Sequence, residues 1–379
     1  MSPATSIPPT RPGATQNGAS GQRSVALDLA RMLGLAAVVV GHTTTDSYLW
    51  LHHLMVAWDV PIFFFISGYL WNEHRSFTDE LRRRSRKLLV PYVCWLAISV
   101  AECVIWQFPD RPLFPTAEQP LNSVFVQALL GGDYVQGPRQ FWGALWFITA
   151  MWSGVLIFRW AGGEHPIWRK LAVKAKLSIS MTAWLGRPHP LLPWAVGIFG
   201  VAWGTFSRET IVAIPEDLGM GLVVVFFMCC GRAFRKLQSG WLGGGLGRPT
   251  PGRTALIGLA LVVVPLVGAY FEVFDELHPK GIWLGTPVIS VAAAVLISAG
   301  IVILCQWAEP HLAVWMRKVV AWLGSIGIAI FIGHSVIREV LTSLTGYRDN
   351  GLLMFLFCYF GSIALGSLIK LTPLRKYLL

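Results

Sequence analysis

Long apolar runs, separated by short charged segments, constrain this sequence more than any other feature. Only 13% of the residues are charged, whereas soluble domains carry about 25%. The runs are long enough to cross roughly 30 Å of hydrocarbon, and they cover residues 26–45, 54–72, 88–106, 141–159, 190–206, 218–234, 254–272, 283–306, 319–341 and 351–371. The sequence therefore predicts an all-α fold, a polytopic membrane helix bundle of about ten transmembrane helices.

The positive charge indicates how the bundle is oriented. The formal net charge is +11, but the Lys and Arg residues form short clusters between apolar runs instead of one continuous basic face. That pattern is typical of topology signals and not of nucleic-acid binding. Most of these residues fall in alternate segments, which predicts cytoplasmic N- and C-termini. The expected location is the plasma membrane, with the chain as a multi-pass protein.

The ends of the chain differ from the apolar body. Residues 1–24 are rich in Pro, Ser, Thr and Gly, without an apolar core, and predict a disordered cytoplasmic tail. Residues 25–371 form the predicted transmembrane domain, and residues 372–379 a second cytoplasmic tail.

The cysteines lie inside apolar runs with no metal-ligand spacing, so we expect neither a structural disulfide nor a metal site.

Ionisable residues in the first predicted helix are the strongest functional signal, because such groups are costly in lipid. Arg31 and His42 are eleven residues apart, which places them on one helical face about 16 Å apart in height. Asp28 lies three residues before Arg31, close enough to pair with it. An alternative interpretation makes Arg31 a membrane anchor and His42 a core histidine bonded to a neighbouring helix.

Further polar or small residues fall at two heights in other spans. Asp59, Glu102 and His334 are predicted near the outer side, at the height of His42. Ser67 and Gly68 are predicted near the inner end of the second span, where small residues let helices approach or leave room for a ligand. A basic segment of residues 74–87 follows, and it would attract anionic lipid or a soluble polyanion.

These motifs resemble the acyltransferase-3 family of integral membrane O-acyltransferases, and within it the branch that includes fucose 4-O-acetylases. Asp28, Arg31 and His42 match the family's R-x10-H signature, and PIFFFISGYL matches its aromatic-Ser-Gly motif. GALWFI around Trp146 and IGIAIFIGHSVI around His334 are also similar to family segments. Two positions depart from the pattern. Met32 follows the arginine where the family usually has Gly, and Asp59 stands where the branch often has His.

The resemblance implies an enzyme that takes an acyl group, with acetyl expected, from cytoplasmic acyl-CoA to a carbohydrate or glycolipid hydroxyl at the outer face. His42 would be the essential catalytic residue, assisted by Arg31 and Asp28, and no bound cofactor is implied. Donor or substrate binding is expected from Ser67, Gly68, Asp59, Glu102, Trp146 and His334. The intramembrane ionisable residues also allow another class, a secondary transporter or flippase for a cell-envelope precursor.

Overall fold

The computed structural model describes residues 24–44, 48–107, 116–118, 123–130, 144–163, 173–175, 178, 180–181, 187–242, 250–345 and 351–379. Over these residues the regular elements are helical, apart from one isolated β-bridge. The longer helices are α1 (Val25–Thr43), α5 (Val90–Gln107), α7 (Trp146–Ala161), α10 (Leu192–Phe206), α12 (Met220–Leu242), α13 (Pro251–Tyr270), α14 (Ile289–Ala308), α15 (Val314–Ser325), α16 (Gly327–Thr345) and α17 (Gly351–Leu371). Shorter ones are α2 (Leu49–Val56), α3 (Pro61–Tyr69), α4 (Phe77–Arg84), α6 (Val124–Leu130), α11 (Arg208–Val212) and α18 (Arg375–Leu378).

Several of these helices have the properties of membrane spans. Among the described residues, five helical segments are long and apolar enough to cross a bilayer, and up to six if the pair α15 and α16, bent by 65°, is one span. Helix α10 is apolar but shorter. Each of the ten predicted runs overlaps a helix, so the all-α membrane bundle is confirmed, while the number of ten spans stays a prediction.

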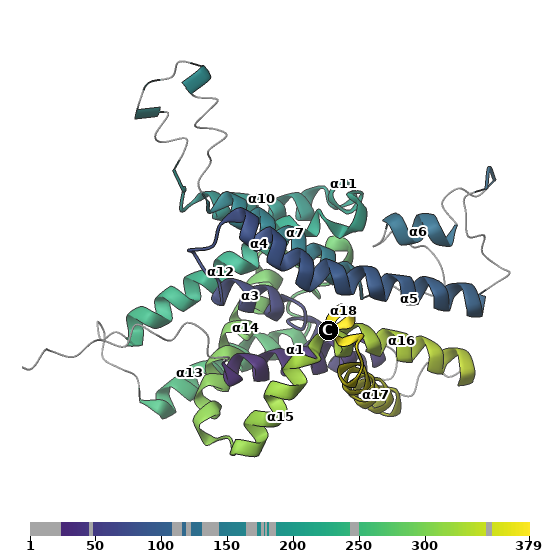
Figure 1. Ribbon diagram of the computed structural model, residues 1–379. Coiled ribbons are helices and arrows are strands. Elements are labelled where there is room, and N and C mark those ends of the chain that lie inside the picture. The colour runs from purple at the N-terminus through teal and green to yellow at the C-terminus, as the bar shows by residue number, and fades with distance from the viewer. Residues whose placement is uncertain are drawn as a thin grey trace, which may run out of the picture.

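Helix α1 lies in the middle of the bundle (Figure 1) and contacts α2, α3, α14, α15, α16 and α17. It begins at Ser24, whose hydroxyl accepts a hydrogen bond from the backbone N–H of Leu27, as an N-cap does. Its flank of small and branched residues, among them Ala30, Ala37 and Val38, is buried. The central position brings the polar residues of α1 next to several other helices.

The second predicted span is broken into α2 and α3, which run antiparallel to α1. The break falls at residues 57–60, just before Pro61. A Cβ atom at Gly41 would lie 3.3 Å from Val56, and one at Gly34 would lie 2.8 Å from Ile62. These contacts set the register, and they place the end of α3 beside the beginning of α1.

Helices α3 and α12 touch through their backbones. A Cβ atom added at Gly68 would lie 2.0 Å from the carbonyl oxygen of Met228, and one at Gly231 would lie 1.9 Å from that of Phe65. Only glycine permits this approach, as at many helix pairs in membranes. The side chains of Tyr69, Gln238 and Gln306 hydrogen-bond in a ring that joins α14 to the same pair.

The outer surfaces of α13 and α17 carry apolar side chains. Leu256 and Val264 on α13 and Leu352 and Phe360 on α17 are all exposed. A soluble protein rarely shows apolar surface of this extent, so these faces fit contact with lipid tails.

The connection between α13 and α14 is irregular but anchored. Leu277, Ile282 and Leu284 are buried in the main hydrophobic cluster, and the Arg208 guanidinium donates to the carbonyl of Gly281. The isolated β-bridge joins His278 and Trp283. This segment, residues 271–288, is called the 271–288 loop below.

The end of the chain packs against α5. The indole N–H of Trp95 donates to the carbonyl of Leu378 at 3.2 Å, and the Leu378 side chain is buried. Residues 372–379, predicted as a tail, thus include the docked helix α18. The predicted tail at 1–24 lies outside the described residues except for Ser24.

Candidate functional site

His42 occupies the last turn of α1 and stacks on His334 of α16. The two ring centroids are 5.2 Å apart, with 27° between the planes. His334 is fully buried, whereas the side chain of His42 is exposed although protein atoms surround it. A small molecule can therefore reach His42, whereas His334 is not accessible.

The hydrogen bonds of the two histidines differ. His334 contacts the carbonyl of Ile330 at 3.3 Å and the hydroxyl of Ser335 at 3.2 Å through its two ring nitrogens. Within the described part of the chain, neither ring nitrogen of His42 has a hydrogen-bond partner. This arrangement differs from that of a core histidine bonded to a neighbouring helix, and it leaves both nitrogens of His42 available to a substrate.

Two cations lie close to His42. Arg338 donates to the His42 carbonyl oxygen at 2.7 Å, and Arg338 and Lys280 are both near enough to act electrostatically on the imidazole. Each comes from a different element, Arg338 from α16 and Lys280 from the 271–288 loop. Positive charge at this end of α1 can stabilise an anion that forms beside His42.

Asp59 approaches the same end of α1 from the break between α2 and α3. Its carboxylate is buried and accepts a hydrogen bond from the backbone N–H of Val60 at 2.6 Å. A Cβ atom on Gly41 would lie 3.5 Å from the other carboxylate oxygen. Asp59 is thus a neighbour of the His42 turn, and its described hydrogen bond is to its own backbone.

A cluster of aromatic side chains lies beside His334. The ring of Phe331 lies 6.2 Å from His334 and 4.6 Å from Phe147, and Phe147 contacts Phe63 of α3 at 5.6 Å. The neighbouring Trp146 is buried, with its ring 6.2 Å from Phe147. The predicted Trp146 position therefore packs into this aromatic cluster.

The predicted pair of Asp28 and Arg31 is present at the other end of α1. Arg31 Nη1 lies 2.9 Å from Asp28 Oδ1, and the carboxylate is buried while the guanidinium is half-exposed. At a rise of 1.5 Å per residue, Asp28 is about 21 Å from His42 along the helix. These residues and His42 therefore belong to two separate regions.

A basic pocket of about 570 Å³ opens at that same end of the bundle. It is lined by Gly68, Leu70, Trp71, Asn72, Glu73, His74, Arg75, Arg232, Arg235, Lys236 and Ser239. Ser67 lies next to this pocket in sequence and hydrogen-bonds to the Met151 sulfur at 3.4 Å. Four Lys and Arg side chains against one carboxylate make the pocket suited to a phosphorylated ligand.

Neighbouring side chains hold the pocket wall and set its electrostatics. Arg159 stacks 4.1 Å from the centre of the Trp71 ring and donates to the carbonyls of Asn72 and Glu73. Burial alone would raise the pKa of the Glu73 carboxyl, but the hydrogen bond and charge of Arg232, with the charge of Lys236, lower that pKa below its ordinary value. Glu73 is thus ionised at neutral pH and fixes Arg232 at the pocket rim.

A third cluster lies on the 271–288 loop and α2. Glu276 contacts His53 at 2.9 Å, and His52 and His278 face the same carboxylate. Burial alone would raise the pKa of Glu276, but the hydrogen bond and charge of His278, with the charges of His52 and His53, lower it. His52 reaches α1 as well, through a contact of 2.8 Å between Nδ1 and the carbonyl of Gly41.

The structure thus divides the predicted site residues between two ends. His42, His334 and Asp59 meet at one end, and Asp28, Arg31, Ser67 and Gly68 lie toward the other. The side chain of Glu102 is outside the described residues. The sequence interpretation missed the pocket cations of α12 and the cluster around Glu276, because each group combines segments far apart in the chain. The basic segment after the second predicted span, which includes Arg75, and the Arg-rich end of an apolar helix were the available signals for the pocket.

A protein-family comparison covers nearly the whole chain. The model of the acyltransferase-3 family, described as an acyltransferase domain, matches residues 24–371. No curated protein and no solved structure matches the chain. The matched region contains both ends of α1, with His42 and the basic pocket.

Proposed function

This chain belongs to the acyltransferase-3 family and is a membrane acyltransferase, and we propose which groups it joins. The donor is cytoplasmic acyl-CoA, with acetyl-CoA the expected form. The acceptor is a hydroxyl of a carbohydrate or glycolipid at the outer face of the plasma membrane. The family assignment favours this enzyme over the secondary transporter or flippase that the intramembrane ionisable residues also allowed.

One observation carries the proposal: an accessible imidazole and a basic pocket lie at opposite ends of one central helix. The pocket at the beginning of α1 offers Arg75, Arg232, Arg235 and Lys236 to an anionic ligand. His42 at the end of α1 offers two unengaged ring nitrogens. A donor with phosphates at one end and a thioester at the other matches this separation, because its charged part and its reacting part need different surroundings.

At the outer end, His42 acts as the general base. Its imidazole accepts the proton of the acceptor hydroxyl while the oxygen attacks the thioester carbonyl. The C–S bond then breaks, and the departing CoA sulfur takes the proton from the imidazolium. Atoms and charge balance, and the products are the acyl ester and free CoA. Arg338 and Lys280 stabilise the oxyanion of the tetrahedral intermediate.

The other site residues have supporting roles in this proposal. His334 holds the His42 ring by stacking, and Asp59 with Glu102 borders the acceptor. Trp146 belongs to the aromatic cluster along which the acyl end of the donor passes. Arg31, paired with Asp28, contacts the pantetheine or phosphate part of the donor, and Ser67 with Gly68 shapes the inner end of the passage.

Transfer activity tests the proposal directly. Purified full-length protein in lipid nanodiscs is mixed with acetyl-CoA, and release of the CoA thiol is followed with and without a glycan or glycolipid acceptor. Thiol release above that of a His42→Gln variant is expected. Mass spectrometry of cell-surface glycans from cells with and without the gene then identifies the acceptor. Unchanged surface glycans and equal thiol release by both proteins would contradict the proposal.

The orientation in the membrane is tested by thiol labelling. Ser239 lines the basic pocket, and Thr210 is exposed near Arg208, which binds the 271–288 loop. In a cysteine-free background, Ser239→Cys is expected to resist an impermeant thiol reagent in intact cells, and Thr210→Cys to react. The reverse pattern would place the pocket outside and would remove the cytoplasmic donor from the proposal.

A further inference from the structure

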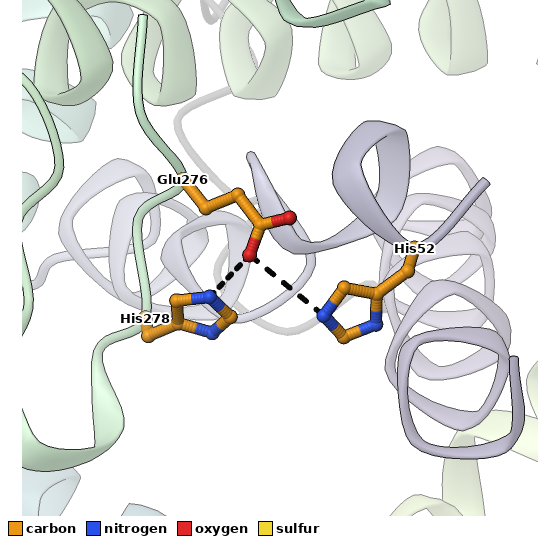
Figure 2. A group of neighbouring side chains, drawn as sticks. All are labelled: His52, Glu276 and His278. Carbon is orange, nitrogen blue, oxygen red and sulfur yellow. Dashed lines mark hydrogen bonds and ion pairs between the residues drawn. The ribbon is translucent and has the colours of Figure 1, made fainter. Parts of the chain in front are cut away.

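Two histidines and a carboxylate from distant segments converge between α2 and the 271–288 loop. Figure 2 shows the Glu276 carboxylate between the rings of His52 and His278, with one oxygen facing both. Glu276 Oε2 lies 3.8 Å from His52 Nε2 and in direct contact with His278 Nε2. One ligand atom from each of the three residues lies within 4.8 Å of the others. Such convergence from two elements makes a compact set of nitrogen and oxygen donors.

The hydrogen bond of His52 orients a lone pair toward this set. Its Nδ1 lies 2.8 Å from the Gly41 carbonyl oxygen, which can only accept, so Nδ1 carries the proton. In the neutral ring, Nε2 then has a free lone pair that faces the Glu276 carboxylate. Two lone pairs that face each other repel, and a cation between them, either a proton or a metal ion, relieves this repulsion. The separation of 3.8 Å is too long for a direct hydrogen bond.

We propose that His52, Glu276 and His278 form a binding site for a divalent transition metal, with Zn²⁺ as the best-suited ion. Two imidazoles and one carboxylate are a ligand set that zinc uses, with the fourth position open to water or another oxygen. Ligands about 2.1 Å from a tetrahedral ion stand about 3.4 Å from one another. Binding would shorten the His52–Glu276 separation and lengthen the Glu276–His278 contact.

The surroundings of the three ligands support this assignment. His53 Nε2 lies 2.9 Å from the other oxygen of Glu276, as an outer residue that orients a ligating carboxylate does. The Gly41 carbonyl does the same for His52. His52 and Glu276 are 15% and 19% exposed, and His278 is 41% exposed. The site is therefore partly shielded, with one side open for the ion to enter.

The loop that supplies two of the ligands is held in place without the ion. Leu277 and Ile282 on either side of His278 are buried, and Asp275 is tied to Thr286 by hydrogen bonds of 2.9 and 3.2 Å. Ligands on an anchored backbone lose little conformational entropy on binding. This preorganisation distinguishes the cluster from histidines that meet by chance on a surface.

Binding at this site would link α2 to the 271–288 loop beside the His42 turn. The same loop carries Lys280, which acts on His42 electrostatically. The ion would thus fix the position of Lys280 relative to His42. This consequence rests on the proposed function, whereas the metal site itself rests on the cluster alone.

Metal content is the first test. Full-length protein, purified in detergent with an affinity tag that contains no histidine, is treated with chelator and then titrated with Zn²⁺. We expect one equivalent of tightly bound zinc and a rise in Tm on its addition. Mg²⁺ should produce no rise, because it prefers oxygen ligands. Co²⁺ should give the visible absorption of a tetrahedral site.

Zinc affinities of single-residue variants then measure how much each side chain contributes to metal binding. Glu276→Gln and His278→Ala are each expected to weaken zinc binding by at least about 100-fold, and His53→Phe by about tenfold as an outer residue. His311→Ala removes an exposed histidine on the turn after α14 and is expected to bind zinc like the original protein. Circular dichroism of the unloaded variants shows whether they remain folded.

Two results would overturn the site. Wild-type protein that binds less than one tenth of an equivalent of zinc would show a hydrogen-bonded His–Glu cluster without an ion. Zinc affinity that is equal in wild type and in folded Glu276→Gln would place binding elsewhere. Neither measurement uses acyl transfer, so failure of the proposed function leaves this test intact.

Discussion

The two ends of α1 are built from different chemistry. At the end of the helix, His42 and His334 stack with few hydrogen bonds, and the charges of Arg338 and Lys280 act on His42. At the beginning, Asp28 and Arg31 form an ion pair, and a neighbouring pocket collects Arg and Lys side chains around Glu73. Among the described residues, His42 has no hydrogen bond at either ring nitrogen, whereas Arg31, Arg232 and Lys236 at the other end are each paired with a carboxylate.

The difference indicates a division of labour. A group that exchanges protons must keep its nitrogens free for the substrate. A pocket that grips a charged ligand works better when its cations are already held in position, because less ordering is needed on binding. We therefore expect substitutions at the His42 end to change the rate of transfer and substitutions at the pocket to change donor affinity.

The largest effect is expected at His42. Loss of general acid–base catalysis typically costs about 10²–10⁴-fold in rate, so His42→Ala and His42→Gln should each lose at least about 10²-fold in kcat. Donor affinity should change little. His334→Phe keeps a ring against His42 and should retain far more activity. The measurement is steady-state transfer beside acyl-CoA binding, and near-normal turnover of His42→Gln would move the catalytic assignment to His334.

A second effect concerns the helix pair that carries the pocket. Gly231→Ala forces a methyl group against the Phe65 carbonyl, and overpacking of this kind costs about 1–3 kcal/mol. Gly240→Ala lies on the same helix with nothing within 4 Å of the added Cβ, so it is the matched control. Thermal unfolding in detergent should show a lower Tm for the first variant alone. Equal Tm values would mean that α3 and α12 separate easily.

Donor affinity should depend on the pocket cations. Arg232→Ala is expected to raise the Kd and the KM for acyl-CoA by about tenfold, because hydrogen bonds to charged groups contribute about 1.5–3 kcal/mol and solvent weakens them here. Lys318→Ala removes an equally positive, exposed side chain outside the pocket and is the control. The effect should shrink at high salt.

Arg31 substitutions test whether the beginning of α1 also contributes to acyl-CoA affinity. Arg31→Ala should also weaken acyl-CoA binding, and Arg31→Lys should restore it only in part, because a guanidinium binds phosphate through two points. If Arg31→Ala and Arg31→Lys both bound donor like wild type, Arg31 would be a membrane anchor and the pocket alone would hold the donor.

The smallest effect is expected at Glu73. Its pKa is lowered by Arg232 and Lys236 against the effect of burial. Because the pKa of Glu73 is lower in the folded protein, its ion pairs stabilise the fold fully at pH values above 4.5, the ordinary pKa of a Glu side chain. This contribution is lost as the pH falls through the lowered pKa. At neutral pH, Glu73→Gln should tighten acyl-CoA binding by about twofold at low salt, because surface charge pairs are weak. Weaker binding by that variant would show that Glu73 chiefly orders Arg232.

Sequence reasoning located the helices and the pair of Asp28 and Arg31 well, because both depend on local spacing. A run of apolar residues specifies a helix, and residues three apart on a helix meet. The break before Pro61 and the 65° bend between α15 and α16 were not predicted, since both depend on how neighbouring helices pack. The count of spans depends on those bends as well.

The candidate site was predictable only residue by residue. His42 and His334 were both singled out from the cost of ionisable groups in lipid, but their stacking joins positions 292 residues apart. The contact between Glu276 and His52, which were not predicted as site residues, also joins positions far apart in the chain. No spacing rule spans such distances, because lateral contacts are set by the packing of the bundle. The height of a residue can be predicted from sequence, whereas its neighbours cannot.

The backbone contact between α3 and α12 has a mechanical consequence. At Gly68 and Gly231 a carbonyl oxygen of the other helix lies where a Cβ atom would be, so no side chain separates the two backbones at these points. Helices α3 and α12 should therefore move as one rigid body. If the helix bundle opens to admit a bulky molecule, the movement has to occur at breaks between other helices. The sharp bend after Ser325, where α15 gives way to α16, is such a break, and it leads directly to the helix that carries His334.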